Sequence, residues 1–171
     1  MHSRIFVLRE VIDGEDLPSI NDLSCVTEEE LFEALHPHIV DYVDRIDDQK
    51  EFNEDIKWLM EAEPCFEAYR ENNQSFITLD VSKGLELVKS KLEKFLEYVK
   101  KISFEEWCSK YSLFLYEMEV YIDEKHGFYV VTVSEDSGWY YETFDEWLYY
   151  HCGKHNDNVK FRVEDIFDYH F

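Results

Sequence analysis

The sequence has few of the residues that break regular structure, with five glycines and three prolines among 171 residues. Low-complexity disorder depends on such residues, so their scarcity argues against it. Basic residues are also scarce, with 17 lysines and arginines against 39 aspartates and glutamates. Proteins bind nucleic-acid backbone by placing lysine and arginine against phosphates. The charge balance therefore argues against direct nucleic-acid binding, and against anionic membrane surfaces for the same reason.

Long apolar runs and paired cysteines are missing as well. The run Ile5–Leu8 is too short for a signal peptide, and no stretch approaches the roughly 18 apolar residues that span a bilayer. The cysteines lie far apart and form no CxxC pair: they are Cys25, Cys65, Cys108 and Cys152. We therefore expect a cytoplasmic protein with no membrane association and with reduced, buried thiols.

The motifs of several enzyme classes are absent too. The chain contains no G-x-S-x-G, no Walker loop, no G-x-G-x-x-G and no HExxH. Five glycines provide no glycine-rich loop to cradle a phosphate. Pairs of neighbouring acids are common, but 39 acidic residues make such pairs expected on a solvated surface. We expect no cofactor and favour a protein that is not an enzyme.

What the sequence has in quantity is aromatic residues and negative charge. Aromatics make up 17% of the chain and apolar residues 45%, which is enough to bury a substantial core. No Pro/Gly/Ser-rich linker divides the chain, so residues 1–171 are predicted to form a single domain. The net charge is −22, and the acids lie mainly between Glu10 and Glu71 and after Ile102. The lysine-rich stretch Ser82–Lys101 between them predicts charge neutralisation within the fold.

Three capping boxes predict helix starts. In each, a Ser or Thr is followed three residues later by Glu, so that the two side chains satisfy each other's backbone amides. They are Thr27 with Glu30, Ser103 with Glu106, and Thr143 with Glu146. The third box predicts a helix over Phe144–Cys152, with Gly153 as its left-handed C-terminal cap.

Apolar spacing predicts three more helices. One opens at Pro37 and carries Val43 and Ile46 on one side, and another lies between Asp47 and Glu63. The clearest has a stripe of apolar residues at helical spacing: Leu85, Val88, Leu92, Phe95, Leu96 and Val99. Such a stripe predicts a helix packed on the core.

Strands are predicted by buried or alternating runs. Ile5–Leu8 is one, and Phe66–Arg70 with Ser75–Leu79 forms a hairpin around Asn72-Asn73-Gln74. A second hairpin is predicted from Glu117–Asp123 and Phe128–Ser134. The last strand is Val159–Val163, followed by a short helical turn. Helices and antiparallel hairpins alternate without a βαβ rhythm, which indicates an α+β fold.

The segment His151-Cys152-Gly153-Lys154-His155 is the one candidate metal site. It offers three borderline ligands, His151, Cys152 and His155, which His36 or His38 could complete. Structural zinc usually takes paired motifs, and none is present. Histidine and lysine at a helix C-terminus also complement the helix dipole. We therefore favour a capping role and assign no metal.

The aromatic segment from Trp139 to Tyr150 is the candidate partner-binding region. Trp147, Leu148 and Tyr150 are expected to face the core with Phe144. Exposed tyrosines and nearby carboxylates would then contact a partner, since interface cores are enriched in Tyr and Trp. The candidate contact residues are Tyr140, Tyr141, Tyr149, Glu135, Asp136, Glu142 and Asp145. The alternative is that these rings only pack the core.

In size, charge and lack of catalytic motifs the chain resembles small acidic inhibitors such as immunity proteins, antitoxins and DNA mimics. The resemblance implies a non-enzymatic module that binds a basic protein partner, where complementary charge speeds encounter. Two alternatives stay open. One is metal-assisted hydrolysis using His151, His155 and nearby acids. The other is a structural or ligand-binding domain whose charge serves solubility alone.

Overall fold

The computed structural model describes residues 2–12, 26–35, 41–109, 128–134 and 138–170, which form a mixed sheet and helices. The described strands are β1 (His2–Glu10), β2 (Tyr42–Arg45), β3 (Phe66–Glu71), β4 (Gln74–Leu79), β5 (Tyr129–Ser134), β6 (Gly138–Thr143) and β7 (Val159–His170). The described helices are α1 (Glu28–Leu35), α2 (Gln49–Ala62), α3 (Val81–Lys101), α4 (Phe104–Ser109) and α6 (Phe144–Lys154). The predicted α+β class is confirmed.

The twelve-residue strand β7 organises the sheet, whose order is β3-β4-β7-β1-β5-β6. One edge of β7 pairs along its length with β1, and the other pairs first with β4 and then with β2. All of these pairs are antiparallel. The one parallel pair among the described strands, β1 with β5, was not expected from the sequence.

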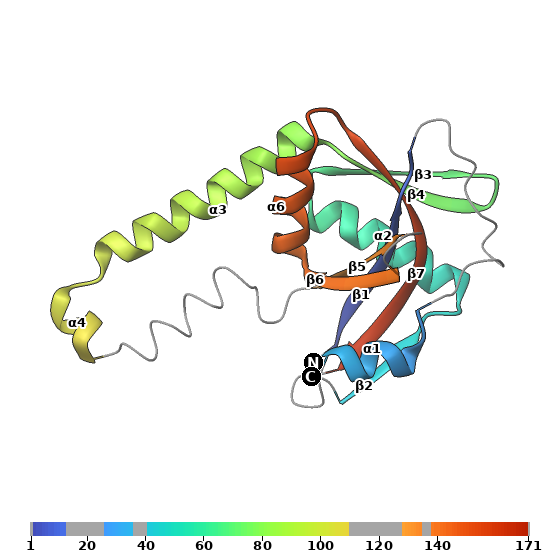
Figure 1. Ribbon diagram of the computed structural model, residues 1–171, viewed down its shortest axis with the longest axis horizontal. Coiled ribbons are helices and arrows are strands. Elements are labelled where there is room, and N and C mark those ends of the chain that lie inside the picture. The colour runs from blue at the N-terminus through green and yellow to red at the C-terminus, as the bar shows by residue number, and fades with distance from the viewer. Residues whose placement is uncertain (1, 13–25, 36–40, 110–127, 135–137, 171) are drawn as a thin grey trace.

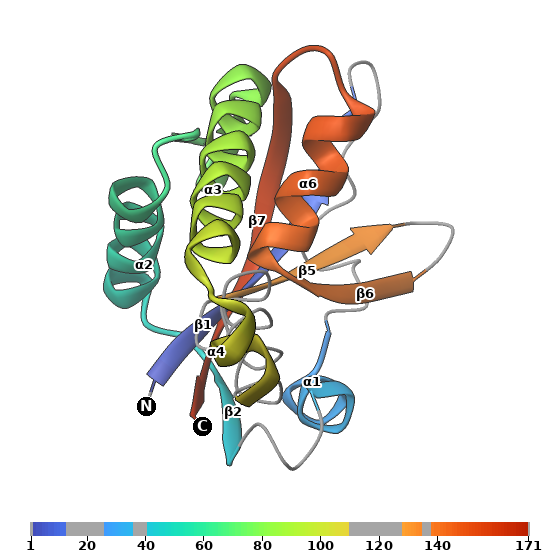
Figure 2. The same ribbon diagram turned by 90° about the vertical axis from the view of Figure 1, so that its left-hand side faces the viewer.

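The two faces of the sheet are covered unequally. The α2 and α6 helices and the first turns of α3 lie over one face, and α1 lies over the other (Figures 1 and 2). The larger core includes Phe6, Phe161, Ile166 and the fully buried Trp147 of α6. The smaller core, under α1, contains Ile5 and Phe167 among others. Neighbouring residues of β1 and β7 thus serve opposite cores, as expected for a strand covered on both sides.

A β-bulge in β7 decides which of its side chains reach which core. Leu8 pairs with Val163 while the preceding Val7 pairs with Asp165, so Glu164 has no partner residue on β1. The extra residue reverses the alternation of the strand. Val163 before the bulge and Ile166 after it therefore both face the larger core. Without the bulge, every residue after it would change faces.

The bulged Glu164 also bridges two buried guanidinium groups and places a negative charge between them. Its Oε1 accepts hydrogen bonds from Nε of Arg9 at 2.9 Å, and from Nε and Nη2 of Arg162 at 3.0 and 2.7 Å. Arg9 and Arg162 stand directly opposite each other on β1 and β7, and both are buried. Like charges at opposed positions repel. The carboxylate between them therefore holds the two strands together at the bulge.

All three predicted capping boxes are present. Thr27, Ser103 and Thr143 each accept a hydrogen bond from the backbone amide of the glutamate three residues later. Each glutamate in turn accepts from the backbone amide of the capping residue. The hairpin β3–β4 is confirmed as well, and Asn72 and Asn73 at its turn have positive φ angles of 49° and 64°. Two such residues in succession match the hairpin turn of type I′.

The helix predicted after Pro37 is wrong where the structure describes it. Tyr42–Arg45 forms strand β2, hydrogen-bonded to the end of β7. Val43 and Ile46, three residues apart, are both buried, and this spacing fits a helix. The segment forms a strand because pairing with the free edge of β7 satisfies backbone groups of both strands. Residues 36–40 lie outside the described part of the chain.

The predictions for three other segments also need correction. The segment after Val163 continues as strand β7 instead of forming a helical turn. Strand β5 was expected to pair with Glu117–Asp123, but both of its edges are taken, by β1 and β6. Residues 110–127 lie outside the described part of the chain. Gly153 is not a left-handed cap, since α6 runs through it to a C-cap at His155.

Two glycines show how closely α3 and α6 approach. A Cβ at Gly84 of α3 would lie 2.5 Å from Sγ of Cys152 and 3.3 Å from Cδ1 of Leu148, both on α6. A Cβ at Gly153, inside α6, would meet no described atom within 4 Å. Only the first glycine is therefore required by packing. None of the described helices is long and apolar enough to cross a membrane.

We predict that Glu164→Gln lowers the free energy of unfolding by about 3 kcal/mol or more. The change removes the counter-charge of two buried guanidinium groups, which is the costly way to break a buried ion pair. Urea denaturation followed by tryptophan fluorescence measures the loss. The matched control is Glu54→Gln, which breaks an exposed pair with Lys50 on α2 and should cost less than about 0.5 kcal/mol. Equal effects of the two variants would contradict the structural role of Glu164.

The glycine contacts predict opposite effects for the same substitution. Gly84→Ala should cost about 1–3 kcal/mol by overpacking the α3–α6 contact. Gly153→Ala should stabilise by up to about 1 kcal/mol, because alanine is the better helix former. Urea denaturation of both variants, and of Gly84→Ala combined with Cys152→Ala, tests this. The double variant should recover part of the loss, and a harmless Gly84→Ala would show that the helices do not touch there.

Candidate functional site

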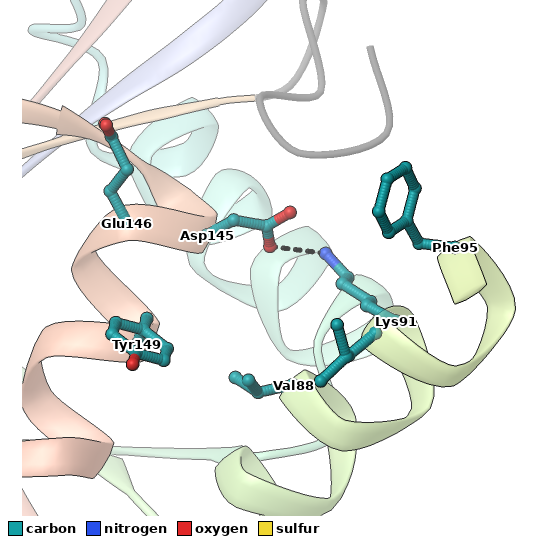
Figure 3. A pocket seen from close by; sticks show the side chains of 7 residues that line it. Val88, Lys91, Phe95, Asp145, Glu146 and Tyr149 are labelled. Carbon is teal, nitrogen blue, oxygen red and sulfur yellow. Dashed lines mark hydrogen bonds and ion pairs between the residues drawn. The ribbon is translucent and has the colours of Figure 1, made fainter. Parts of the chain in front are cut away.

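A hollow of about 340 Å³ lies on the surface between α3 and α6 (Figure 3). It is lined by Val88, Lys91, Leu92, Phe95, Asp145, Glu146 and Tyr149. We call it the α3–α6 groove. Four of these side chains are large and apolar or aromatic, and Figure 3 shows Tyr149 and Val88 facing the space from opposite helices. A surface of this kind can take an apolar side chain from a binding partner.

The groove exists because the two helices differ in length. At a rise of 1.5 Å per residue, the 21 residues of α3 span about 32 Å and the 11 residues of α6 about 17 Å. The first turns of α3 pack against α6, and the remainder runs outward from the sheet (Figure 1). The apolar stripe predicted to pack on the core therefore does so only in part. Leu92 is 54% exposed and Leu96 is exposed as well.

One ion pair joins the two sides of the groove. Lys91 of α3 donates a hydrogen bond to Oδ1 of Asp145 on α6 (Figure 3). Nζ of Lys91 also lies 5.6 Å from the centroid of the Phe144 ring. Both charged side chains are largely buried, so their charges offset each other near the groove. Glu146, one residue further on, is held by the capping box with Thr143.

The structure separates the predicted partner-binding residues into three groups. Tyr149, which is 71% exposed, and Asp145 both line the α3–α6 groove. Tyr140 and Tyr141 are exposed on β6, where neighbouring side chains point to opposite sides of the sheet. The predicted exposure of all three tyrosines is confirmed. Glu135 and Asp136 lie outside the described residues.

Glu142 of β6 is less suited to contact with a partner than the exposed tyrosines. It is half-buried, and its Oε2 is buried with no hydrogen-bond partner among the described residues. Burial, with a smaller effect from the charge of Glu146, raises the pKa of the Glu142 carboxyl. A carboxyl group in this position is poorly placed to contact a partner that approaches from solvent.

Tyr150 was expected in the core, but it is exposed, and His151 takes the buried position instead. His151 lies one helical turn after Trp147, on the side of α6 that faces the sheet. Its ring contacts the rings of Trp147 and Phe161, with centroids 4.7 and 5.0 Å away. Phe144, Trp147 and His151 are spaced so that they lie on one side of α6. The sequence interpretation had placed Tyr150 on that side instead of His151.

His151 belongs to a cluster with Glu10 and His155 at the end of α6, and we call these three residues the Glu10–His151–His155 cluster. One ligand atom from each lies within 4.8 Å of the other two. Glu10 ends β1, 141 positions before His151 in the chain, and His155 caps α6. The rings of His151 and His155 are nearly parallel, with centroids 5.7 Å apart.

Both histidines of this cluster have buried ring nitrogens without hydrogen-bond partners among the described residues. His151 is 1% exposed, and neither of its ring nitrogens has a hydrogen-bond partner among the described residues. Nε2 of His155 is also buried and lies 3.6 Å from Oε1 of Glu10, too far for a hydrogen bond. Burial, followed by the nearby His155 and Lys154, lowers the pKa of His151 to about 3. The imidazole of His151 is therefore uncharged near neutral pH.

Cys152, the third ligand predicted from the sequence, does not join the cluster. Its Sγ faces Gly84 of α3, in the contact between the helices. Burial raises the pKa of its thiol, and burial raises that of Cys65 to about 12, so both thiols stay protonated and unreactive. Cys108 was also expected to be buried but is exposed. Cys25, His36 and His38 lie outside the described residues.

Sequence reasoning identified two of the three residues of the Glu10–His151–His155 cluster, and two of the seven that line the α3–α6 groove. His151 and His155 were named, but Glu10 was not, because nothing in the sequence links the end of the first strand to the end of a helix 141 positions later. Leu92 and Phe95 were assigned to the core. The length of the α3 stripe was a usable signal, since a stripe longer than its packing partner leaves apolar residues uncovered.

Comparisons with protein-family models, with curated proteins and with solved structures found no match for this chain. Its function is therefore argued from its own surface and side chains.

Proposed function

We propose that this protein is a non-enzymatic interaction module whose α3–α6 groove binds a cationic, amphipathic helix of a partner protein. The observation that carries the proposal is the groove itself, with Tyr149 and Leu92 exposed at its sides. A helix that lays its apolar face into such a groove is a recurrent mode of peptide recognition.

The exposed apolar residues of α3 support this mode. Leu92 and Leu96 are four residues apart, so they lie on the same side of the helix and continue the lining of the groove outward. Covering such side chains with a partner removes them from water, which stabilises by about 25 cal/mol for each Å² of apolar surface. Tyr149 opposite them is a rigid aromatic side chain of the type that is enriched at the centres of interfaces.

The charge of the chain supports a cationic partner. The net charge of −22 attracts basic proteins over distance and repels acidic ones. Two lysines of α3 near the groove have acidic partners, since Lys91 pairs with Asp145 and Lys89 with Glu93. We therefore expect charge to control the association rate and its salt dependence, while the apolar groove supplies affinity.

The test is affinity capture from host lysate at low salt, performed in parallel with wild type, Leu92→Ser and Leu85→Ser. Leu85 is the matched control: it lies on the same helix and is 49% exposed, but it does not line the groove. We expect a basic protein to be retained by wild type and Leu85→Ser, to be at least tenfold depleted with Leu92→Ser, and to elute in high salt.

A second measurement locates the contact without a known partner. A synthetic helical peptide with leucine on one face and lysine on the other is titrated into the labelled protein. The NMR shifts of the backbone amides are followed. Shifts concentrated at Val88, Phe95 and Tyr149 would agree with the proposal. Equal capture by all three proteins, or peptide shifts confined to the acidic surface of α1 and α2, would contradict it. Either result would place the contact on the charged surface outside the groove.

A further inference from the structure

We propose that the Glu10–His151–His155 cluster is a binding site for a divalent transition metal of the zinc class. The proposal does not rest on the proposed function, because the cluster lies at the C-terminal end of α6, beyond the residues that line the α3–α6 groove. It assigns to Glu10 and the two histidines a role that neither cap geometry nor core packing requires.

One of the three distances between ligand atoms fits a metal better than it fits a hydrogen bond. Zinc binds imidazole nitrogen and carboxylate oxygen at about 2.0–2.2 Å in tetrahedral geometry, which places neighbouring ligand atoms about 3.3–3.6 Å apart. Nε2 of His155 lies 3.6 Å from Oε1 of Glu10. A hydrogen bond between them would bring the atoms to about 2.7–3.2 Å. A separation of this size leaves room for an ion between the two groups.

The buried nitrogens of His151, which have no hydrogen-bond partner in the described part of the chain, are the second observation. Burial of a polar group without a hydrogen bond costs roughly 1–3 kcal/mol, so such groups in folded proteins call for an explanation. Packing alone would be served by an apolar ring, as it is at the neighbouring Phe161. A metal ion would satisfy a nitrogen of His151 and the buried Nε2 of His155 together.

The helix dipole at the cluster favours a cation, and neighbouring contacts orient the ligands. It lies at the C-terminus of α6, where the helix dipole is negative. Contacts with Trp147 and Phe161 hold the His151 ring in place. The second oxygen of Glu10 lies 3.5 Å from Nζ of Lys154, which leaves Oε1 to face the histidines. Such an outer contact orients a carboxylate ligand.

The ligand set also indicates which metal binds. Two imidazoles and one carboxylate suit zinc and its neighbours in the first transition row, whereas magnesium and calcium take oxygen ligands. Glu10 and His155 are partly exposed, so an ion can enter from their side. Three protein ligands leave a fourth position for water. The bound metal would tie the end of β1 to the end of α6 and so stabilise the fold.

The experiment is a calorimetric titration of Zn²⁺ into the full chain, purified without a histidine tag and freed of metal with chelator. Wild type is compared with Glu10→Gln and His155→Ala, whose side chains are partly exposed and can be changed without opening the core. His170→Ala is the matched control, because His170 pairs with Asp41 at the other end of β7 and is also partly exposed. His151 is left unchanged, since its loss from the core could unfold the protein.

We expect wild type and His170→Ala to bind one Zn²⁺, and each cluster variant to bind it at least tenfold more weakly. Zn²⁺ should raise the melting temperature of wild type and His170→Ala but not of the cluster variants, because a ligand stabilises only the state that binds it. Co²⁺ should give the visible absorption of a tetrahedral site. Absence of Zn²⁺ binding to wild type, equal binding by the cluster variants, or an equal melting shift with Mg²⁺ would each overturn the proposal.

Discussion

The position of Glu164 in β7 is the constraint on which the rest of the structure depends. β7 pairs with β1, β2 and β4, so any shift of its register would move side chains throughout the sheet. The bulge sends Phe161 and Ile166 to the larger core and Phe167 to the smaller one. The carboxylate of Glu164 also lies between two buried arginines. The same residue therefore sets the strand register and compensates buried positive charge.

Helix α6 connects that framework to both proposed sites. Trp147 and its neighbours bury one side of the helix against the sheet, which fixes its position. Tyr149 then necessarily points toward α3, and His151 and His155 toward the end of β1. The groove and the cluster use different sides and different turns of one helix. Binding at either site is therefore expected to depend on how firmly α6 is packed, and not on direct contact between the sites.

Prediction from the sequence succeeded where a feature is local. The three capping boxes and the Asn72-Asn73 turn depend on residues three or four positions apart, and all of them are present. It failed where pairing with a strand that is distant in the sequence decides the local structure. Val43 and Ile46 fit a helix equally well, and only the edge of β7 made their segment a strand. Part of each candidate site was found, because the exposed tyrosine and the paired histidines could be read from α6 alone.

The sequence alone predicted three helix starts, the α+β class, the exposure of three tyrosines and the strongly acidic charge, because each follows from composition or from neighbours along the chain. Only the tertiary structure decided the parallel pairing of β1 with β5, the uncovered half of α3 and the meeting of Glu10 with His151. These three depend on which surfaces meet across more than a hundred residues or on where two helices of unequal length stop touching. No local pattern encodes such distances, because they result from packing the whole chain at once.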